Sequence, residues 1–466
     1  MGHPNTRHEA TSGRRWAGMF WAAAVAAALG AAPMTHGEES VAATRPEGPA
    51  ATILGSMDDP ALKELAQDVL ERNPRIAGAK ARARAAREHV RQAEALPDPM
   101  LGATGFVSSP ETRVGPQTVA GMLSQKLPWF GKLGLKGQAA LQQAAALDAQ
   151  AEALRLELLT ETRRLYHEIG FLDAWREAVV ADRETLLHYE ELARTRYASG
   201  AGIAQAVIKI QAEITKDDTR LLEIDNRRAA LVAALNSLRD RPQDTTVAPV
   251  THGAFLEVAP DPGALRLAAL RSRPEIERAD ADLARAQTMI DLARKGYKPD
   301  LTLVASYTRV GLRDDPAGIA TPPPDNGQDV FAVSATINLP IHRGRLAAAV
   351  REAAEMRRAA AEEKRAVVTS VDRALGELVE RVRLTWQQLR LFEDVLGVQA
   401  DQSLRSAEAS YASGQLNSLD LLDAERVLLD VRTATERTRA DHAIALARLE
   451  GAVAEPLPKN QGASQR

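Results

Sequence analysis

Two acidic residues with helical spacing are the strongest candidates for chemistry in this sequence. Asp420 and Asp423 follow a stretch that contains Gly414, and residues three apart lie on one face of a helix. In a single chain, such a pair is most simply solvated and interacts favourably with the positive N-terminal end of the helix dipole. If several copies placed the pair around one axis, the carboxylates would form a ring that attracts cations. The residues alone favour the first interpretation.

The other polar residues form no catalytic or cofactor-binding pattern. The 9 histidines are scattered, and there is no His-x-x-x-His pair, glycine-rich phosphate loop or Gly-x-Ser-x-Gly turn. The acid pairs Asp217-Asp218, Glu190-Glu191 and Glu362-Glu363 fall in helical charge patterns and are expected on solvated faces. The absence of cysteine removes disulfides, thiolate metal sites and cysteine nucleophiles. We therefore expect no enzyme, no cofactor and no metal site.

Composition favours long helices over a large globular core. Apolar residues make up 45% of the 466 residues, but aromatic residues only 4%. Alanine, leucine, arginine and glutamate dominate, which suits helices that approach one another closely. With a net charge of -3 the chain has no general attraction to nucleic acid, and we expect none as a partner.

The first 37 residues have the pattern of a secretory signal peptide. Arg14 and Arg15 precede an apolar run from Trp16 to Leu29, and small residues follow it. The run is shorter than the roughly 20 residues of a membrane-spanning helix, and a retained amphipathic anchor is the alternative. Because the chain has no cysteine, it also lacks the acylated residue of a lipoprotein, so we expect no lipid anchor. No later segment is apolar enough to cross a bilayer as a helix, so only strands could do so.

An internal duplication organises the rest of the chain. The segment 72–76, Arg-Asn-Pro-Arg-Ile, recurs as Ser-Arg-Pro-Glu-Ile at 272–276. Leu127-Pro128 recurs as Leu339-Pro340, and Tyr-Ala-Ser-Gly occurs at 197–200 and again at 411–414. The matches keep one order at an offset that drifts only from 200 to 214. We therefore predict an extended segment over 38–60, a first repeat over 61–250, a second over 251–455 and a tail over 456–466.

Each repeat is expected to contain a helix, two strands and a long helical hairpin. Neither 129–241 nor 341–455 contains a proline, which predicts hairpins over 132–241 and 344–455 that turn at Gly200 and Gly414. Apolar residues recur every seven positions in both hairpins, a pattern that makes helices supercoil around neighbours. The first hairpin's series is Leu158, Leu165, Leu172, Val179 and Leu186.

The expected strands cover about 99–107, 117–128, 299–310 and 329–340. In the last of these, Phe331, Val333, Ala335, Ile337 and Leu339 alternate with polar residues, as in a transmembrane strand. The alternative is two soluble hairpins that cap a helical bundle. Four strands cannot close a barrel, so in a membrane several copies would have to share one.

The two helix–strand–strand–helix–helix repeats resemble the TolC-like outer-membrane efflux protein family, the outer-membrane component of tripartite pumps. The resemblance covers about 61–455. It implies a mainly helical trimer in which each protomer contributes four strands to a 12-stranded barrel in the outer membrane lipid. The long helices of the protomers would form a periplasmic tunnel. It also implies two protein partners, a periplasmic adaptor protein and an inner-membrane pump of the RND type, in a Gram-negative bacterium.

The most specific local match is the segment 411–424, Tyr-Ala-Ser-Gly-Gln-Leu-Asn-Ser-Leu-Asp-Leu-Leu-Asp-Ala. By this resemblance Asp420 and Asp423 correspond to the carboxylates that ring the closed aperture of the tunnel. Gly200 and Gly414, beside Tyr197 and Tyr411, correspond to the helix tips where the adaptor docks. The alternative is plain helix–helix turns with packing tyrosines. The first repeat departs from the pattern, because Ala206 stands where an acid would be expected.

The sequence thus predicts a passive outer-membrane export channel. A soluble periplasmic coiled-coil adaptor is the alternative, although an adaptor has one hairpin flanked by β domains, whereas this chain has two hairpins. The exported substrate is left open between metal cations and drugs or other solutes. Methionines and histidines form no ladder along the helices, so no specific metal path is expected.

Overall fold

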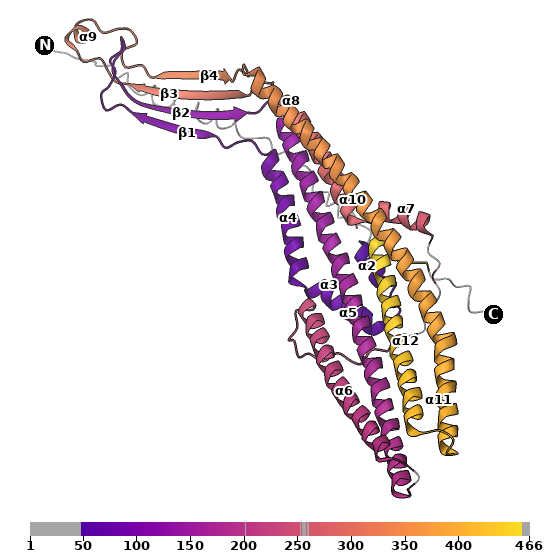
Figure 1. The fold of residues 1–466 in the computed structure, drawn as a ribbon. Coiled ribbons are helices and arrows are strands. Elements are labelled where there is room, and N and C mark those ends of the chain that lie inside the picture. The colour runs from indigo at the N-terminus through magenta and orange to yellow at the C-terminus, as the bar shows by residue number, and fades with distance from the viewer. Residues whose placement is uncertain (1–47, 201, 252, 254–257, 259–260, 459–466) are drawn as a thin grey trace, which may run out of the picture. The chain divides into compact units, whose positions relative to one another are not determined.

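The fold was analysed in a computed structural model, which describes residues 48–200, 202–251, 253, 258 and 261–458. The predicted signal peptide over 1–37, residues 38–47 and the tail residues 459–466 lie outside the described residues. Helices predominate, and four strands form a single sheet (Figure 1). The fold is therefore mainly helical with one small β part.

The described residues up to 250 form five helices and two strands. They are α2 (Pro49–Gly55), α3 (Pro60–Arg72), α4 (Pro74–Glu94), β1 (Met100–Gly105), β2 (Gln117–Leu127), α5 (Lys132–Ala198) and α6 (Ala204–Leu238). The expectation of an extended segment up to residue 60 is wrong for α2. Pro49 starts this helix, and Ala50 and Ile53, three residues apart, are buried against apolar residues of α3 and α5.

Among its described residues the second repeat has no counterpart of α2, and it otherwise keeps the same order with two additions. Its elements are α7 (Pro262–Ser272), α8 (Pro274–Lys295), β3 (Leu301–Val310), α9 (Pro316–Ala320), β4 (Val330–Ile337), α10 (Arg343–Leu391), the π-helix η1 (Phe392–Leu396), α11 (Gly397–Ala412) and α12 (Ser418–Val453). The additions are α9, which lies in the loop between the strands, and η1, which interrupts the first arm of the hairpin. Within η1, Glu393 accepts hydrogen bonds from Arg439 of α12 at 2.9 and 2.7 Å.

The four strands form one antiparallel sheet in the order β1-β2-β3-β4. The central pair, β2 and β3, joins the two repeats, so the strands are not two separate hairpins. Among the described residues, β1 and β4 each pair on one side only, and the strands pack chiefly against one another. The sheet therefore has two open edges.

The two faces of the sheet differ in polarity. Opposite residues of antiparallel strands share a face. One face is mainly apolar, with Gln125 and Arg309 as exceptions, and carries Leu101, Leu123, Leu127, Leu301, Leu303, Ala305, Tyr307, Phe331, Val333, Ala335 and Ile337. The other face carries most of the hydroxyl groups, from Ser124, Thr302, Ser306, Thr308, Ser334 and Thr336. Val333 is 82% exposed and Phe331 is 68% exposed, so nothing in the described part of the protomer covers the apolar face there.

The core lies among the helices, with α5 at its centre. This 67-residue helix packs against α4, α6, α8 and α12. Its heptad residues are all buried, namely Leu158, Leu165, Leu172, Val179 and Leu186. Figure 1 shows α5 and α6 meeting at one tip, and α11 and α12 meeting at the other. Among the described helices, none is both long and apolar enough to cross a membrane.

Candidate functional site at the helix tips

Each hairpin turns at a glycine in the left-handed backbone region. Gly200 and Gly414 both have a φ of 76°. The amide of Gly200 donates to the carbonyl of Tyr197 at 3.0 Å, and the amide of Gly414 donates to the carbonyl of Tyr411 at 3.1 Å. A Cβ at either glycine would meet no atom within 4 Å, so backbone conformation alone favours glycine there. The two tips therefore have the same turn.

The two tip tyrosines occupy matching positions in different environments. Tyr411 is 5% exposed and packs with apolar residues of α5, α6 and α12. Its hydroxyl accepts a hydrogen bond from Ser418 Oγ at 3.1 Å. Tyr197 is 55% exposed. Tyr411 is thus a core residue beneath its turn, whereas Tyr197 presents a free aromatic surface in the protomer.

Arg196 connects the two tips and was not found from the sequence. Its guanidinium carbon lies 4.0 Å from the centroid of the Tyr411 ring. It also donates to the carbonyl of Tyr411, and to that of Ala412 at 3.4 Å. Such a stacked, charge-assisted contact holds the end of α5 against the end of α11. The only signal in the sequence is the position of Arg196, one residue before Tyr197.

Asp420 and Asp423 lie at the start of α12, and both are exposed. Asn417 caps this helix, because its Oδ1 accepts from the amides of Leu419 at 2.8 Å and Asp420 at 3.1 Å. Asn417 Nδ2 in turn donates to Asp420 Oδ2 at 2.7 Å. Asp420 is therefore held by the cap, while Asp423 stands one turn further along the helix. The corresponding start of α6 has no side-chain cap, and Ala206 there is buried.

Both tips line one cleft of about 820 Å³. Residues 411–420 form one wall, and Arg196, Gly202, Ile203 and Ala206 form the other. The cleft brings Tyr411, Gly414 and Asp420 together. Its lining does not include Tyr197, Gly200 or Asp423. Three of the six predicted tip residues thus line one cleft, and the other three lie outside its lining.

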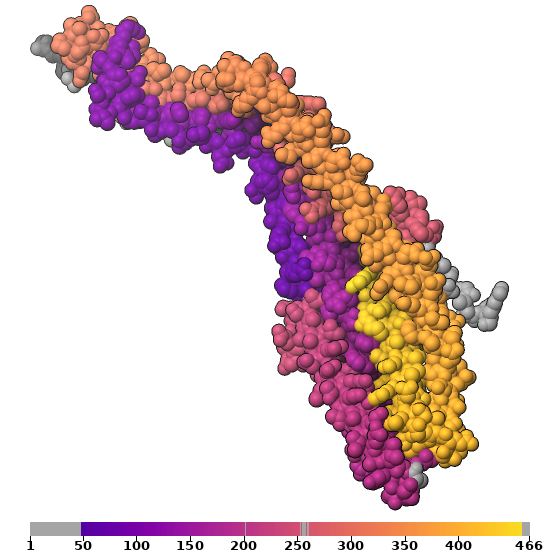
Figure 2. All heavy atoms as spheres, in the orientation of Figure 1, coloured from indigo at the N-terminus to yellow at the C-terminus, as the bar shows by residue number. Residues whose placement is uncertain are grey.

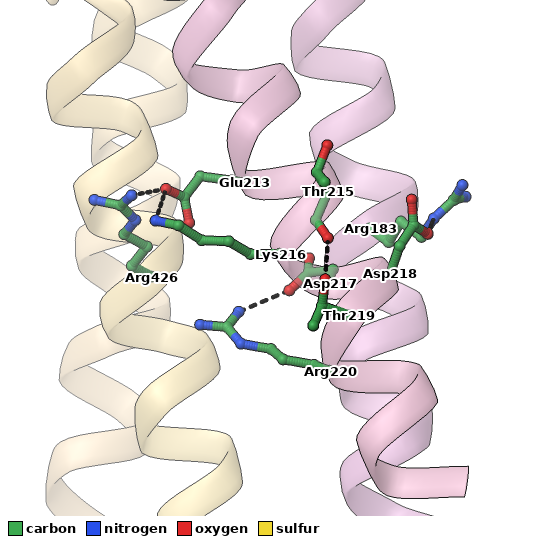
Figure 3. A network of polar contacts seen from close by, with 9 residues as sticks. All are labelled: Arg183, Glu213, Thr215, Lys216, Asp217, Asp218, Thr219, Arg220 and Arg426. Atoms are coloured by element: carbon green, nitrogen blue, oxygen red, sulfur yellow. Dashed lines mark hydrogen bonds and ion pairs between the residues drawn. The ribbon is translucent and has the colours of Figure 1, made fainter. Parts of the chain in front are cut away.

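A cluster of buried acids lies above the tips, and one of its members, Asp217, was predicted on a solvated face. Asp217 is 0% exposed, and Asp182 and Glu425 are 7% and 4% exposed. The neighbouring Asp218 is exposed and pairs with Arg183 at 2.7 Å, so only half of the Asp217-Asp218 pair fits the expectation. Figure 3 shows Asp217 joined to Arg220, and Glu213 joined to Lys216 and to Arg426 of α12.

Burial and mutual contact shift the protonation of this cluster. Burial, together with hydrogen bonding to Asp217 and Glu425, raises the pKa of Asp182 to about 9. Burial also raises the pKa of Glu425, although the nearby Arg432 acts in the opposite direction. The signal available in the sequence was the heptad position of these acids, which the charge pattern of the helices obscured.

Comparison with known proteins gives a consistent match over most of the chain. A sequence model of the family described as "Outer membrane efflux protein" matches residues 65–239 and 265–455. The probable efflux pump outer membrane protein TtgC of Pseudomonas putida is 25% identical over 430 residues, which are 85% of this chain and 86% of the relative. The outer membrane protein TolC of Vibrio cholerae is 23% identical over 67% of this chain and 71% of its own length. The solved outer membrane protein VceC of Vibrio cholerae shares the fold with a TM-score of 0.70, at 22% identity, over 85% of this chain and 97% of its own.

Proposed function

This chain belongs to the outer membrane efflux protein family, and from that membership we propose how its parts make a channel. The protein is an outer-membrane efflux channel. In our proposal three copies close one barrel from their four-stranded sheets and one periplasmic tunnel from their helical hairpins. The resulting conduit is passive, and it takes over solute from an inner-membrane pump of the RND type through a periplasmic adaptor.

The sheet is the observation that carries this proposal. Its two open edges leave backbone groups unpaired in the protomer, and unpaired groups are strongly unfavourable in lipid. Four strands are too few for a barrel, whereas three sets of four remove every edge. The exposed apolar face of the sheet suits contact with lipid, and the hydroxyl-bearing face suits a water-filled interior.

The helices offer a second surface for sister subunits. Leu384 and Leu391 lie seven residues apart on α10, and Val398 lies on α11 beyond the π-helix η1. All three are about half exposed. Figure 2 shows α10 and α11 beside α12. The three exposed residues differ from Leu375, Val382 and Leu389 of α10, which are buried within the protomer. Exposed apolar residues that no described part of the protomer covers favour packing against another helix hairpin. In our proposal that hairpin belongs to a neighbouring copy.

The tips are proposed as the regulated end of the conduit. Around a threefold axis the exposed Asp420 and Asp423 of each copy would make a ring of carboxylates that attracts cations. The turns at Gly200 and Gly414, with the exposed Tyr197, would present the docking surface for the adaptor. Since the sequence has no cysteine for acylation, membrane attachment would depend on the strands alone.

Reconstitution of the full chain tests this function against the soluble-adaptor alternative. Purified protein added to a planar lipid bilayer should produce stepwise, voltage-independent conductance, and protein in cells should remain with outer membranes after an alkaline wash. The variant Val333→Lys, which places a charge on the apolar face, should be defective in insertion. A wild-type protein that washes off membranes and conducts no ions would rule out the channel.

A further inference from the structure

Three acids occupy positions that the heptad pattern reserves for apolar side chains. On α5, Asp182 lies three residues after the buried Val179 and four before the buried Leu186. On α6, Asp217 lies seven residues from both Ile210 and Ile224. On α12, Glu425 lies between buried leucines at 421–422 and 428–429. All three acids therefore project into the seam where the two hairpins meet.

The carboxyl groups face one another and leave oxygens unpaired. Asp182 lies within hydrogen-bonding reach of both Asp217 and Glu425. Asp182 Oδ1, Asp217 Oδ2 and Glu425 Oε2 are buried and have no hydrogen-bond partner among the described residues. A carboxylate can only accept hydrogen bonds, so two carboxylates in contact need a proton between them. Buried carboxyl oxygens without a donor therefore favour a proton shared between these groups.

The surrounding charges do not neutralise the cluster. On α6, Arg220 pairs with Asp217 at 2.7 Å, and Glu213 is occupied by Lys216 and by Arg426 of α12. On α11, Glu408 accepts a hydrogen bond from the Tyr189 hydroxyl of α5 at 2.7 Å. On α12, Arg432 is the cation that acts on Glu425. Arg220 and Arg432 offset two of the three central carboxylates, so one negative charge remains in the seam.

We propose that Asp182, Glu425 and Asp217 form a proton-binding site that holds α12 against α5 and α6. One proton from water binds between Asp182 and Glu425 and makes one carboxyl group a donor to the other. When the pH rises far enough to remove that proton to solvent, two ionised carboxylates face each other in a dry seam. Their repulsion then weakens the contact between the two hairpins.

The site connects to the tip through α12. Glu425 lies two residues after Asp423 and five after Asp420, so it fixes the same stretch of helix that carries both acids. This consequence rests on the proposed function, in which those acids line the aperture. With the proton bound, the first turns of α12, which carry Asp420 and Asp423, stay packed against α5. Loss of the proton in alkaline solution releases these turns from α5.

Infrared spectroscopy of the purified full chain tests the site directly. A protonated carboxyl group has a carbonyl absorption that a carboxylate lacks, so the wild type should show that band at pH 7.5 and lose it in alkaline solution. Asp182→Asn should remove the band at pH 7.5. Asp218→Asn, at the exposed position next to Asp217, should leave it unchanged.

The infrared band reports on the carboxyl group itself and does not depend on conduction or on partner proteins. A failure of the proposed proton site can therefore be distinguished from a failure of the proposed channel function. A wild-type spectrum without the band at pH 7.5 would overturn the proposal, and a metal cation held by three ionised carboxylates would give that result. So would a band that persists in both Asp182→Asn and Glu425→Gln.

Hydrogen exchange tests whether loss of the proton weakens the contact between the two hairpins. It also reveals a variant that folds poorly. Relative to residues of α4, the amides of 419–428 in the wild type should exchange severalfold faster at pH 9.5 than at pH 7.5, after correction for the chemical exchange rate. In Asp182→Asn, where an amide replaces the titrating group, this change should be lost. Equal pH dependence in wild type and variant, or no pH dependence in the wild type, would contradict a proton that joins the hairpins.

Discussion

At the residue scale, Asp420 and Asp423 differ in how firmly they are held. Asp420 belongs to the Asn417 cap of α12, whereas Asp423 has only its place on the exposed face of the helix. Loss of charge at Asp420 therefore has to be separated from loss of the cap, which typically costs about 1 kcal/mol. Asparagine preserves an oxygen that can accept from Asn417, so it is a better substitution than alanine.

The double variant Asp420→Asn with Asp423→Asn should weaken block by multivalent cations. Removing the charges of a narrow carboxylate ring lowers its attraction for a cation, and we expect the blocking concentration in single-channel recordings to rise about tenfold or more. Asp401→Asn, which changes a partly exposed acid of α11, should leave block unaltered. Identical block in the double variant and the wild type would remove these acids from the aperture.

Residue roles were only partly accessible from the sequence. The glycine turns and the exposed acids of α12 follow from local pattern, because turns and caps depend on neighbouring residues. The burial of Asp217 and the contact of Arg196 with Tyr411 depend on residues of the other repeat, about 200 positions away. Charge pattern alone places Asp217 in water, and only the packing of three helices reveals the cluster.

At the element scale, the strands are the part of the protein that we propose to lie in the membrane. A lysine at Val333 should impair assembly, because it places a charge on the apolar face at a cost of about 2–4 kcal/mol near the bilayer midplane. Ser334→Lys, on the opposite face of the same strand, should be tolerated. The amounts of folded protein in the outer membrane measure the difference, and equal yields would show that the face assignment is wrong.

Neighbouring residues determine where some of the helices begin, whereas α2 and the π-helix η1 are not predictable from them. Pro74 and Pro274 each begin a new helix, and the first helical segment of each repeat is therefore divided into two. Helix α2 depends on burial of Ala50 and Ile53 against distant residues, which a local pattern cannot indicate. The π-helix also escapes prediction, since the heptad series continues through Leu389 and Leu396 as though the helix were regular.

At the scale of the whole molecule, the duplication joins the helices and the sheet. Each repeat supplies one hairpin and two neighbouring strands, and the sheet is completed where β2 meets β3. Helix α5 of the first repeat packs on α8 and α12 of the second. Neither repeat could bury these surfaces alone. The mainly helical fold and its repeat order were predictable because composition and periodicity recur along the chain, whereas the pairing of β2 with β3 required the structure.

In our proposal sister copies close the sheet, and the number of chains in the complex is therefore the decisive measurement. We would extract the mature protein from outer membranes in mild detergent and measure its mass by native mass spectrometry. We expect a stable complex of three chains that persists on dilution. A monomer that stays folded in water, with its strands protected from hydrogen exchange and no tendency to enter lipid, would contradict it.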